Sequence, residues 1–149
     1  MKKTTVYLLG IATVLLICII AYFKPLSLLN DMSENGQISM ILNEYIFRNG
    51  VPDIDVTEYE DITAEQKCSL LSLLEEYTYR RTFGTLFSSG YMTGTGNQML
   101  YIYVFGDNSG LDSILVTSSE KIVVNGKNYR MENAEQFIEE IIDILEQTN

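Results

Sequence analysis

The sequence predicts an α+β protein: an N-terminal transmembrane helix, then an antiparallel sheet of about 4–5 strands with two amphipathic helices packed on one face. Three observations predict it. A charge-free apolar run of 18 residues, Val6 to Phe23, stands near the start of the chain. Short apolar runs separated by turn residues follow in close succession. Two segments with helical spacing of apolar residues and N-cap signals flank most of these runs.

The apolar run is long enough to cross the hydrocarbon core of a bilayer as a helix. Eighteen residues rising about 1.5 Å each reach roughly 27 Å. Lys2 and Lys3 precede the run and Lys24 follows it, whereas all twenty acidic residues come after Lys24. Because basic residues favour the cytoplasmic side, we expect a single-pass protein of the cell membrane, with a cytoplasmic N-terminus and an extracellular domain.

Two other routes would also bring the domain out of the cytoplasm. A signal peptide is cleaved after small residues, and the best candidate site ends at Ala21, with the bulky Ile19 where a small residue is preferred. A lipoprotein would be modified at Cys18, but Ile17 occupies the position that normally takes Gly, Ala or Ser. We therefore expect an uncleaved anchor, with secretion after cleavage and lipidation at Cys18 as the alternatives.

The chain divides into three predicted parts: a cytoplasmic tip and anchor over residues 1–24, a tether over 25–37 and an α+β domain over 38–149. The tether is rich in Ser, Asn, Asp and Gly at its far end. A domain of this length buries enough apolar surface to fold without disulfides. The two cysteines do not suit a disulfide, and we expect Cys68 on the polar flank of its helix.

The first half of the domain contains a strand and a helix. Residues 38–47 partly alternate between apolar and polar types, which is typical of a strand, and residues 54–60 predict a loop or a short edge strand. Thr63 and Gln66 match a capping box, which predicts a helix over residues 64–79.

The second half predicts strands joined by tight turns, followed by a helix. Asn125-Gly126 between two apolar runs predicts a hairpin, because a type I′ turn needs positive φ at both central residues. Asn133, with Gln136 three residues later, predicts the N-cap of the last helix. The expected strands lie within residues 82–97 and over residues 99–105, 111–116, 122–124 and 127–131.

Ile122 to Leu145 resembles the end of a domain of unknown function in small membrane-anchored or secreted Gram-positive bacterial proteins. In those proteins a hairpin leads into an amphipathic C-terminal helix. The likeness is seen in the hairpin residues Asn125, Gly126, Lys127 and Tyr129. It implies the same hairpin and helix here and an extracytoplasmic location, and it implies no catalytic residue.

Composition excludes several function classes. The chain has no histidine, which excludes the usual Ser-His-Asp and Cys-His catalysis and histidine metal sites. The formal net charge of −10 disfavours a nucleic-acid partner, because the phosphate backbone is also negative. A basic protein or peptide is the partner that this charge suits. We expect no cofactor and no catalytic residue.

A short acidic segment is a weak candidate for a cation site. Carboxylate oxygens at this density suit Ca²⁺. We expect the alternative, a solvated acidic segment that keeps an edge strand from pairing, and a docking surface for a basic partner is a third interpretation. The candidates are Asp53, Asp55, Glu58, Glu60 and Asp61.

Tyr101 and Tyr103 are the candidate interaction surface. They alternate with Leu100, Ile102 and Val104, so they share one face of the predicted strand. If no helix covers that face, the two rings offer aromatic contact area for a ligand or partner. The alternative role, which we expect, is core packing or a half-exposed sheet face.

We therefore expect a non-catalytic, membrane-anchored extracytoplasmic binding or interaction module with an acidic surface. One alternative is an immunity or resistance protein against a cationic peptide. Another is a small envelope enzyme that uses two opposed carboxylates. A concave pocket that gathers two or more acidic groups would favour the enzyme and count against the non-catalytic module. The oligomeric state stays open.

Overall fold

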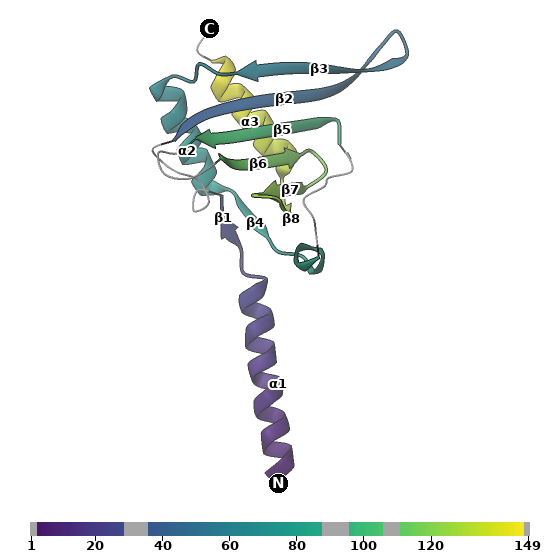
Figure 1. Cartoon of the computed structure of the whole chain (residues 1–149), viewed down its shortest axis with the longest axis vertical. Helices are drawn as coiled ribbons and strands as arrows, with labels where there is room; N and C mark the ends of the chain where they lie inside the picture. Colours follow the sequence, from purple (N-terminus) through teal and green to yellow (C-terminus); the bar gives the residue numbers. More distant parts are fainter. Residues whose placement is uncertain (1–2, 29–35, 88–95, 106–110, 148–149) are drawn as a thin grey trace.

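The computed structural model describes residues 3–28, 36–87, 96–105 and 111–147, and in these residues three α-helices accompany an eight-stranded antiparallel sheet (Figure 1). The strands lie side by side in the order β1-β4-β8-β7-β6-β5-β2-β3. The elements are α1 (Lys3–Tyr22), β1 (Leu26–Ser27), β2 (Gln37–Arg48), β3 (Val51–Tyr59), α2 (Ala64–Glu76), β4 (Thr78–Arg80), the 3₁₀ helix η2 (Phe83–Leu86), β5 (Gln98–Phe105), β6 (Leu111–Thr117), β7 (Lys121–Val124), β8 (Lys127–Met131) and α3 (Ala134–Glu146).

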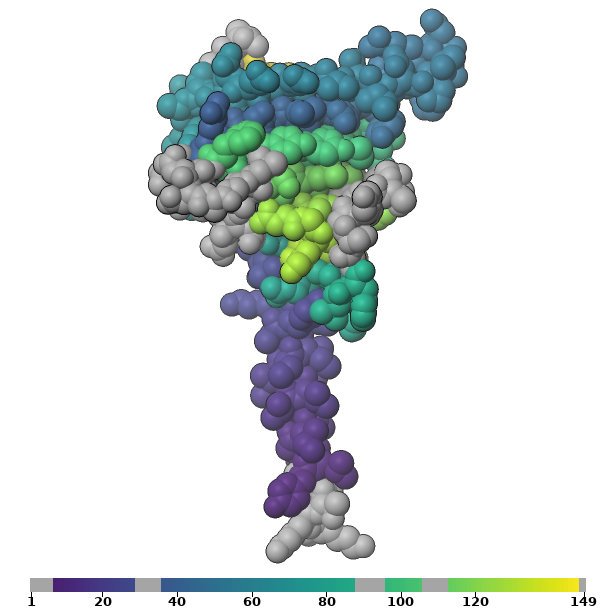
Figure 2. Space-filling model, in the orientation of Figure 1, coloured from purple at the N-terminus to yellow at the C-terminus, as the bar shows by residue number. Residues whose placement is uncertain are grey.

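Helix α1 projects away from the sheet, and its apolar side chains are exposed on all sides (Figures 1 and 2). The predicted transmembrane helix is wrong. A spanning helix needs about 20 predominantly apolar residues, and among the described residues no helix is long and apolar enough to cross a membrane.

The C-terminal end of α1 packs on the segment that joins β4 to η2. The Phe23 and Phe83 rings meet edge to face with centroids 5.0 Å apart. The Arg81 guanidinium lies 5.4 Å from the centroid of the Tyr22 ring and donates a 3.3 Å hydrogen bond to the Tyr22 carbonyl. Beyond this contact β1 pairs with β4 and Leu28 is fully buried, so the chain joins the sheet within the segment predicted as a tether.

The sheet has eight strands in the described residues, so the prediction of four to five is wrong. Strand β3 was expected as a loop or short edge strand. It is an edge strand, and it pairs with β2 along nine residues, where Ile54 and Val56 alternate with Asp53 and Asp55. Strand β4 begins where the helix was expected to continue, since α2 ends at Glu76 and Tyr77 is extended. Strand β1 has only two residues, too few for a sequence pattern.

The segment 82–97 also differs from its prediction. Its described residues form η2 instead of a strand, with the Thr82 backbone N–H donating a 2.8 Å hydrogen bond to the Thr85 hydroxyl. Residues 88–95 lie outside the described part of the chain.

Helices α2 and α3 lie on the same side of the sheet, which we call the helix face (Figure 1). Alternate residues of the central strands point into the core beneath them. The intervening residues point to the opposite side, which we call the open face. The core includes Ile38, Met40, Leu42, Leu100, Ile102, Val104, Ile114, Val116, Ile122, Val124, Phe137, Ile138 and Ile141.

Two of the three predicted end signals are confirmed. Thr63 and Gln66 form the capping box at the start of α2. Asn125 and Gly126 both have positive φ, at 47° and 76°, in the β7–β8 turn. The Asn133 side-chain cap is wrong: this residue is left-handed with φ 59° and makes no side-chain cap bond, because it follows directly on β8 in a tight turn into α3.

Candidate functional site

Tyr101 and Tyr103 lie on the open face, where no described helix covers them. Their rings are stacked, with centroids 6.3 Å apart and planes within 8° of parallel. Both side chains are half-buried. The pKa of Tyr101 is raised by burial first, and then by the nearby phenols of Tyr103 and Tyr45. The condition that made these tyrosines candidates, a sheet face without a helix over it, is therefore met in the described residues.

The register extends this surface across two more strands. Ile41 of β2 pairs with Tyr101, so Tyr45 and Phe47 farther along β2 share the open face. Ile54 of β3 pairs with Tyr45. The result is an apolar and aromatic surface made by Tyr45, Phe47, Ile54, Val56, Tyr101 and Tyr103, which we call the aromatic surface.

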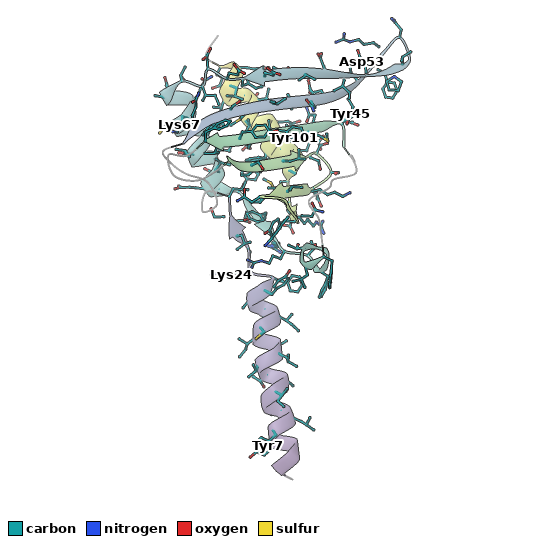
Figure 3. All side chains as sticks on the ribbon, in the orientation of Figure 1. Tyr7, Lys24, Tyr45, Asp53, Lys67 and Tyr101 are labelled. Atoms are coloured by element: carbon teal, nitrogen blue, oxygen red, sulfur yellow. The ribbon has the colours of Figure 1, made fainter. Side chains whose placement is uncertain are left out.

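Part of the aromatic surface lies on an arm that projects beyond the rest of the domain. Strand β5 pairs with β2 only as far as Glu44, so residues 45–54 form a two-stranded extension, and the arm is this extension together with the Glu44–Asp55 pair at its base (Figures 2 and 3). On the open face of this extension the Phe47 side chain is 75% exposed and Ile54 49%. Large apolar side chains at this exposure are unusual in an isolated domain when they share one face.

The carboxylates of β3 separate onto the two faces of the sheet. Asp53 and Asp55 lie on the helix-face side of the arm, because their partners are Ile46 and Glu44. Arg48 approaches both of them, with Nε 3.3 Å from Asp53 and Nη2 3.2 Å from Asp55. All three side chains are about half exposed, so these ion pairs contribute little to stability.

Three carboxylates share a single arginine in this part of the arm. Glu44 is the direct cross-strand partner of Asp55, and like charges at such positions repel. The Gln98 amide donates a 2.8 Å hydrogen bond to the Glu44 carboxylate. Because the amide is neutral, it does not cancel the charge of Glu44. Among the described residues, Arg48 is the cation that forms ion pairs in this group. One positive charge against three carboxylates leaves Glu44, Asp53 and Asp55 with a net negative charge.

The remaining acidic candidates lie at the other end of β3, beside a pocket of about 660 Å³. Glu58, Glu60 and Asp61 line it together with Glu146 at the end of α3. Tyr59 also lines it, and its pKa is raised by burial first and then by Glu146 and Glu44.

The wall of this pocket is held by Gln66. Its side-chain carbonyl accepts the Thr63 backbone N–H at 2.9 Å, and its amide nitrogen donates to the Leu145 carbonyl at 3.0 Å. These bonds join the start of α2 to the end of α3. They hold together the ends of α2 and α3 that line the pocket.

The five candidate carboxylates are not gathered into one cluster. Asp53 and Asp55 lie on the arm, and the other three lie at the pocket. Among the described residues, no three His, Cys, Asp or Glu side chains are close enough together to hold a metal ion. The structure adds no support for a cation site, which stays a prediction.

Sequence reasoning missed four of the six residues of the aromatic surface. Tyr45 and Phe47 could have been assigned to the same face as Ile41 from the alternation in residues 38–47. Ile54 and Val56 were missed because their segment was expected as a loop or a short edge strand, with no register to β2. The two cysteines add nothing to the site: Cys18 and Cys68 are both free and exposed, as expected for Cys68.

Comparison with known proteins gives no family: no protein-family model, curated protein or solved structure matches this chain.

Proposed function

We propose that this chain is a non-catalytic binding module that takes a basic protein or peptide on its aromatic surface and the adjoining acidic arm. The single observation that carries the proposal is the uncovered aromatic surface itself. Ile54 is 49% exposed, Val56 52% and Phe47 75%, and they share the open face with the stacked Tyr101 and Tyr103. Exposed apolar residues gathered on one face mark interaction sites, and tyrosines contribute strongly to binding energy at them.

Charge supports a basic partner. The chain has a formal net charge of −10, and Glu44, Asp53 and Asp55 on the arm share only Arg48. These carboxylates lie on the face opposite the aromatic surface, so the matching partner reaches both faces at the β3 edge. Its apolar side chains would contact the aromatic surface, and its lysine or arginine side chains would contact the acidic face and speed association at low salt. A cationic peptide toxin is one concrete form of such a partner, which would make the chain an immunity protein.

A small carboxylate enzyme is the second candidate, and the acidic pocket favours it. The pocket gathers Glu58, Glu60, Asp61 and Glu146, which is the arrangement expected to count against a non-catalytic module. We rank the enzyme second because all four side chains are exposed. A carboxyl that serves as a general acid is normally held in a desolvated environment.

We also propose that the module acts outside the cytoplasm. Support comes from the charge distribution, since every acidic residue follows Lys24 while Lys2 and Lys3 precede the apolar segment. The proposed route is export with cleavage or lipidation of the apolar segment. Mass spectrometry of the protein from cell fractions tests it, and a cytoplasmic protein that retains Met1 would contradict it.

Selection from a random peptide library tests the binding function. The immobilised full chain should enrich peptides rich in lysine and arginine. Raising the salt from about 50 mM to about 500 mM should weaken their binding at least tenfold, because exposed charges are then screened. Enrichment of acidic peptides, or of none, would contradict the proposal.

A paired variant links this binding to the aromatic surface. Tyr101→Ser with Tyr103→Ser should reduce the affinity for a selected basic peptide by about tenfold or more, as expected for truncation of aromatic anchors. The control is Tyr7→Ser, a tyrosine that is 72% exposed on α1 and lies far from the sheet (Figure 3). Equal affinities in both variants would exclude the aromatic surface as the binding site.

For the enzyme, the discriminating variant is Asp61→Asn with Glu146→Gln, which removes two carboxylates from the pocket at positions outside β3. The binding module predicts unchanged peptide affinity in this variant. Hydrolysis of envelope polymer by the full chain, lost in the variant, would establish the enzyme instead.

A further inference from the structure

Resting on the proposed function, we propose that β3 is a strand-addition site: its free edge takes an extended basic segment of the partner as a ninth strand. Strand β3 is the last strand in the sheet order and pairs only with β2 among the described residues. Its pairing with β2 runs without interruption from Val51 to Tyr59. The opposite edge therefore offers nine residues of backbone, about 30 Å long, for pairing.

Strand β3 lacks some of the devices that commonly block an exposed edge and keeps others. Such edges are protected by charged side chains, a bulge, a proline or very short length. Here the register with β2 is continuous over nine residues and no lysine is present, while Pro52 near the start and the acidic side chains remain as protection. The acidic charge repels an acidic strand and attracts a basic one.

The two faces of β3 determine the pattern of the added strand. Over its central residues it presents Asp53 and Asp55 on the helix-face side and Ile54 and Val56 on the open face, and Glu58 follows on the open face. Neighbouring strands place side chains of directly opposite residues on the same face. The segment that fits is therefore one in which basic residues alternate with apolar or aromatic residues.

A second copy of this chain is a poor occupant of the same edge. Antiparallel self-pairing about the middle of β3 would set Asp55 against Asp55 of the other copy. Each copy already has Glu44 directly across from Asp55. Four carboxylates would then lie close together with only two arginines, the Arg48 of each copy, and like charges placed directly opposite destabilise a strand pair.

The test uses three synthetic nine-residue peptides with the full-length chain. The first alternates lysine with valine, the second has the same composition with its lysines in one block, and the third alternates glutamate with valine. Affinities are measured by calorimetry and amide hydrogen exchange by mass spectrometry. We expect the alternating lysine peptide to bind at least tenfold more tightly than the other two and to slow exchange in the segment that contains β3.

A charge reversal with a matched control locates the contact. Asp55→Lys should weaken binding of the alternating peptide by tenfold or more. Glu139→Lys makes the same change in net charge at an exposed position on α3 and should change the affinity less than threefold. Circular dichroism of both variants establishes that each is folded. Equal loss in the two variants would overturn the inference.

The remaining outcomes separate this inference from the proposed function. If the blocked and alternating lysine peptides bind equally, and binding depends on Tyr101 and Tyr103 without slower exchange in β3, strand addition is overturned and the binding function stands. If no basic peptide binds, both are overturned. If sedimentation shows a dimer and dimer formation slows exchange in β3, the occupant of the edge is a second copy and the inference is wrong.

Discussion

The rings of Tyr101 and Tyr103 stack within 8° of parallel on a sheet face that no described helix covers. Side chains of residues two apart on one strand lie on the same face of the sheet. The phenol of Tyr103 contributes to the raised pKa of Tyr101, second to burial. The pair therefore behaves as one aromatic unit whose two hydroxyl groups influence each other.

Tyr103→Leu should lower the pKa of Tyr101 while leaving it above the ordinary value of about 10. The change removes the neighbouring phenol but not the burial, which is the larger cause. NMR titration of ring-labelled tyrosine measures it, with Tyr7→Leu as the control. An unchanged Tyr101 titration would show that the two phenols do not interact.

Tyr77 should titrate at a pKa of about 12 in the folded protein, because burial, the hydrogen bond to Glu140 and the charges of Glu140 and Glu76 all favour the neutral phenol. The hydroxyl lies 3.0 Å from the Glu140 carboxylate. A raised pKa means that the stability contributed by this phenol is fully present below about pH 10 and is lost as the pH rises through about 12.

Glu140→Gln should lower the Tyr77 pKa and move this loss of stability to lower pH, since it removes two of the causes. Denaturant unfolding at a series of pH values measures the shift. Glu139→Gln, on the adjacent exposed position, is the control. An identical pH profile in the two variants would contradict the assignment.

Thr63→Ala should reduce the free energy of unfolding by about 1 kcal/mol, the usual cost of losing an N-cap. The Thr63 hydroxyl accepts the Gln66 backbone N–H at 3.2 Å, and alanine leaves that donor without its cap. Thr63→Ser keeps the hydroxyl and should lose much less. Urea unfolding compares the two, and equal losses would mean that the hydroxyl has no capping role.

Gly126→Ala should destabilise the fold by about 1 kcal/mol through backbone conformation alone. Gly126 has φ 76°, and a methyl group there would meet no atom within 4 Å. Gly10→Ala is the control, because Gly10 is helical and its surroundings are equally open. Thermal unfolding gives the comparison, and a neutral Gly126→Ala would show that the turn tolerates a side chain.

Arg48→Met should increase the affinity for a lysine-rich peptide several-fold, because it removes the cation that now pairs with Asp53 and Asp55. Stability should change by less than about 1 kcal/mol, since these pairs are exposed. Arg130→Met removes a comparable exposed pair, with Glu120, and is the control for net charge. Weaker binding in Arg48→Met than in the control would argue that Arg48 itself contacts the partner.

The elements that the sequence predicts well are those specified by local chemistry. The Thr63 capping box and the Asn125-Gly126 turn each depend on a few neighbouring residues, and both are present. The face shared by Tyr101 and Tyr103 follows from strand alternation in the same way.

The elements that the sequence did not predict depend on pairing with distant segments. Strand β4 exists because β8 and β1 pair with it on either side, against a helical pattern that runs on to Tyr79. Strand β3 is defined by β2. The Asn133 cap failed because the turn from β8 places this residue in a left-handed conformation. The contribution of Ile54 and Val56 to the aromatic surface depends on the β2–β3 register and was missed for the same reason.

The sheet order also sets how far the acidic arm reaches. Strand β1, which follows α1, and strand β3 are the two opposite edges of the sheet (Figure 1). Seven strand spacings separate them, which at about 4.8 Å each is roughly 34 Å. The sheet therefore acts as a spacer that places the acidic edge of β3 on the far side of the domain from α1.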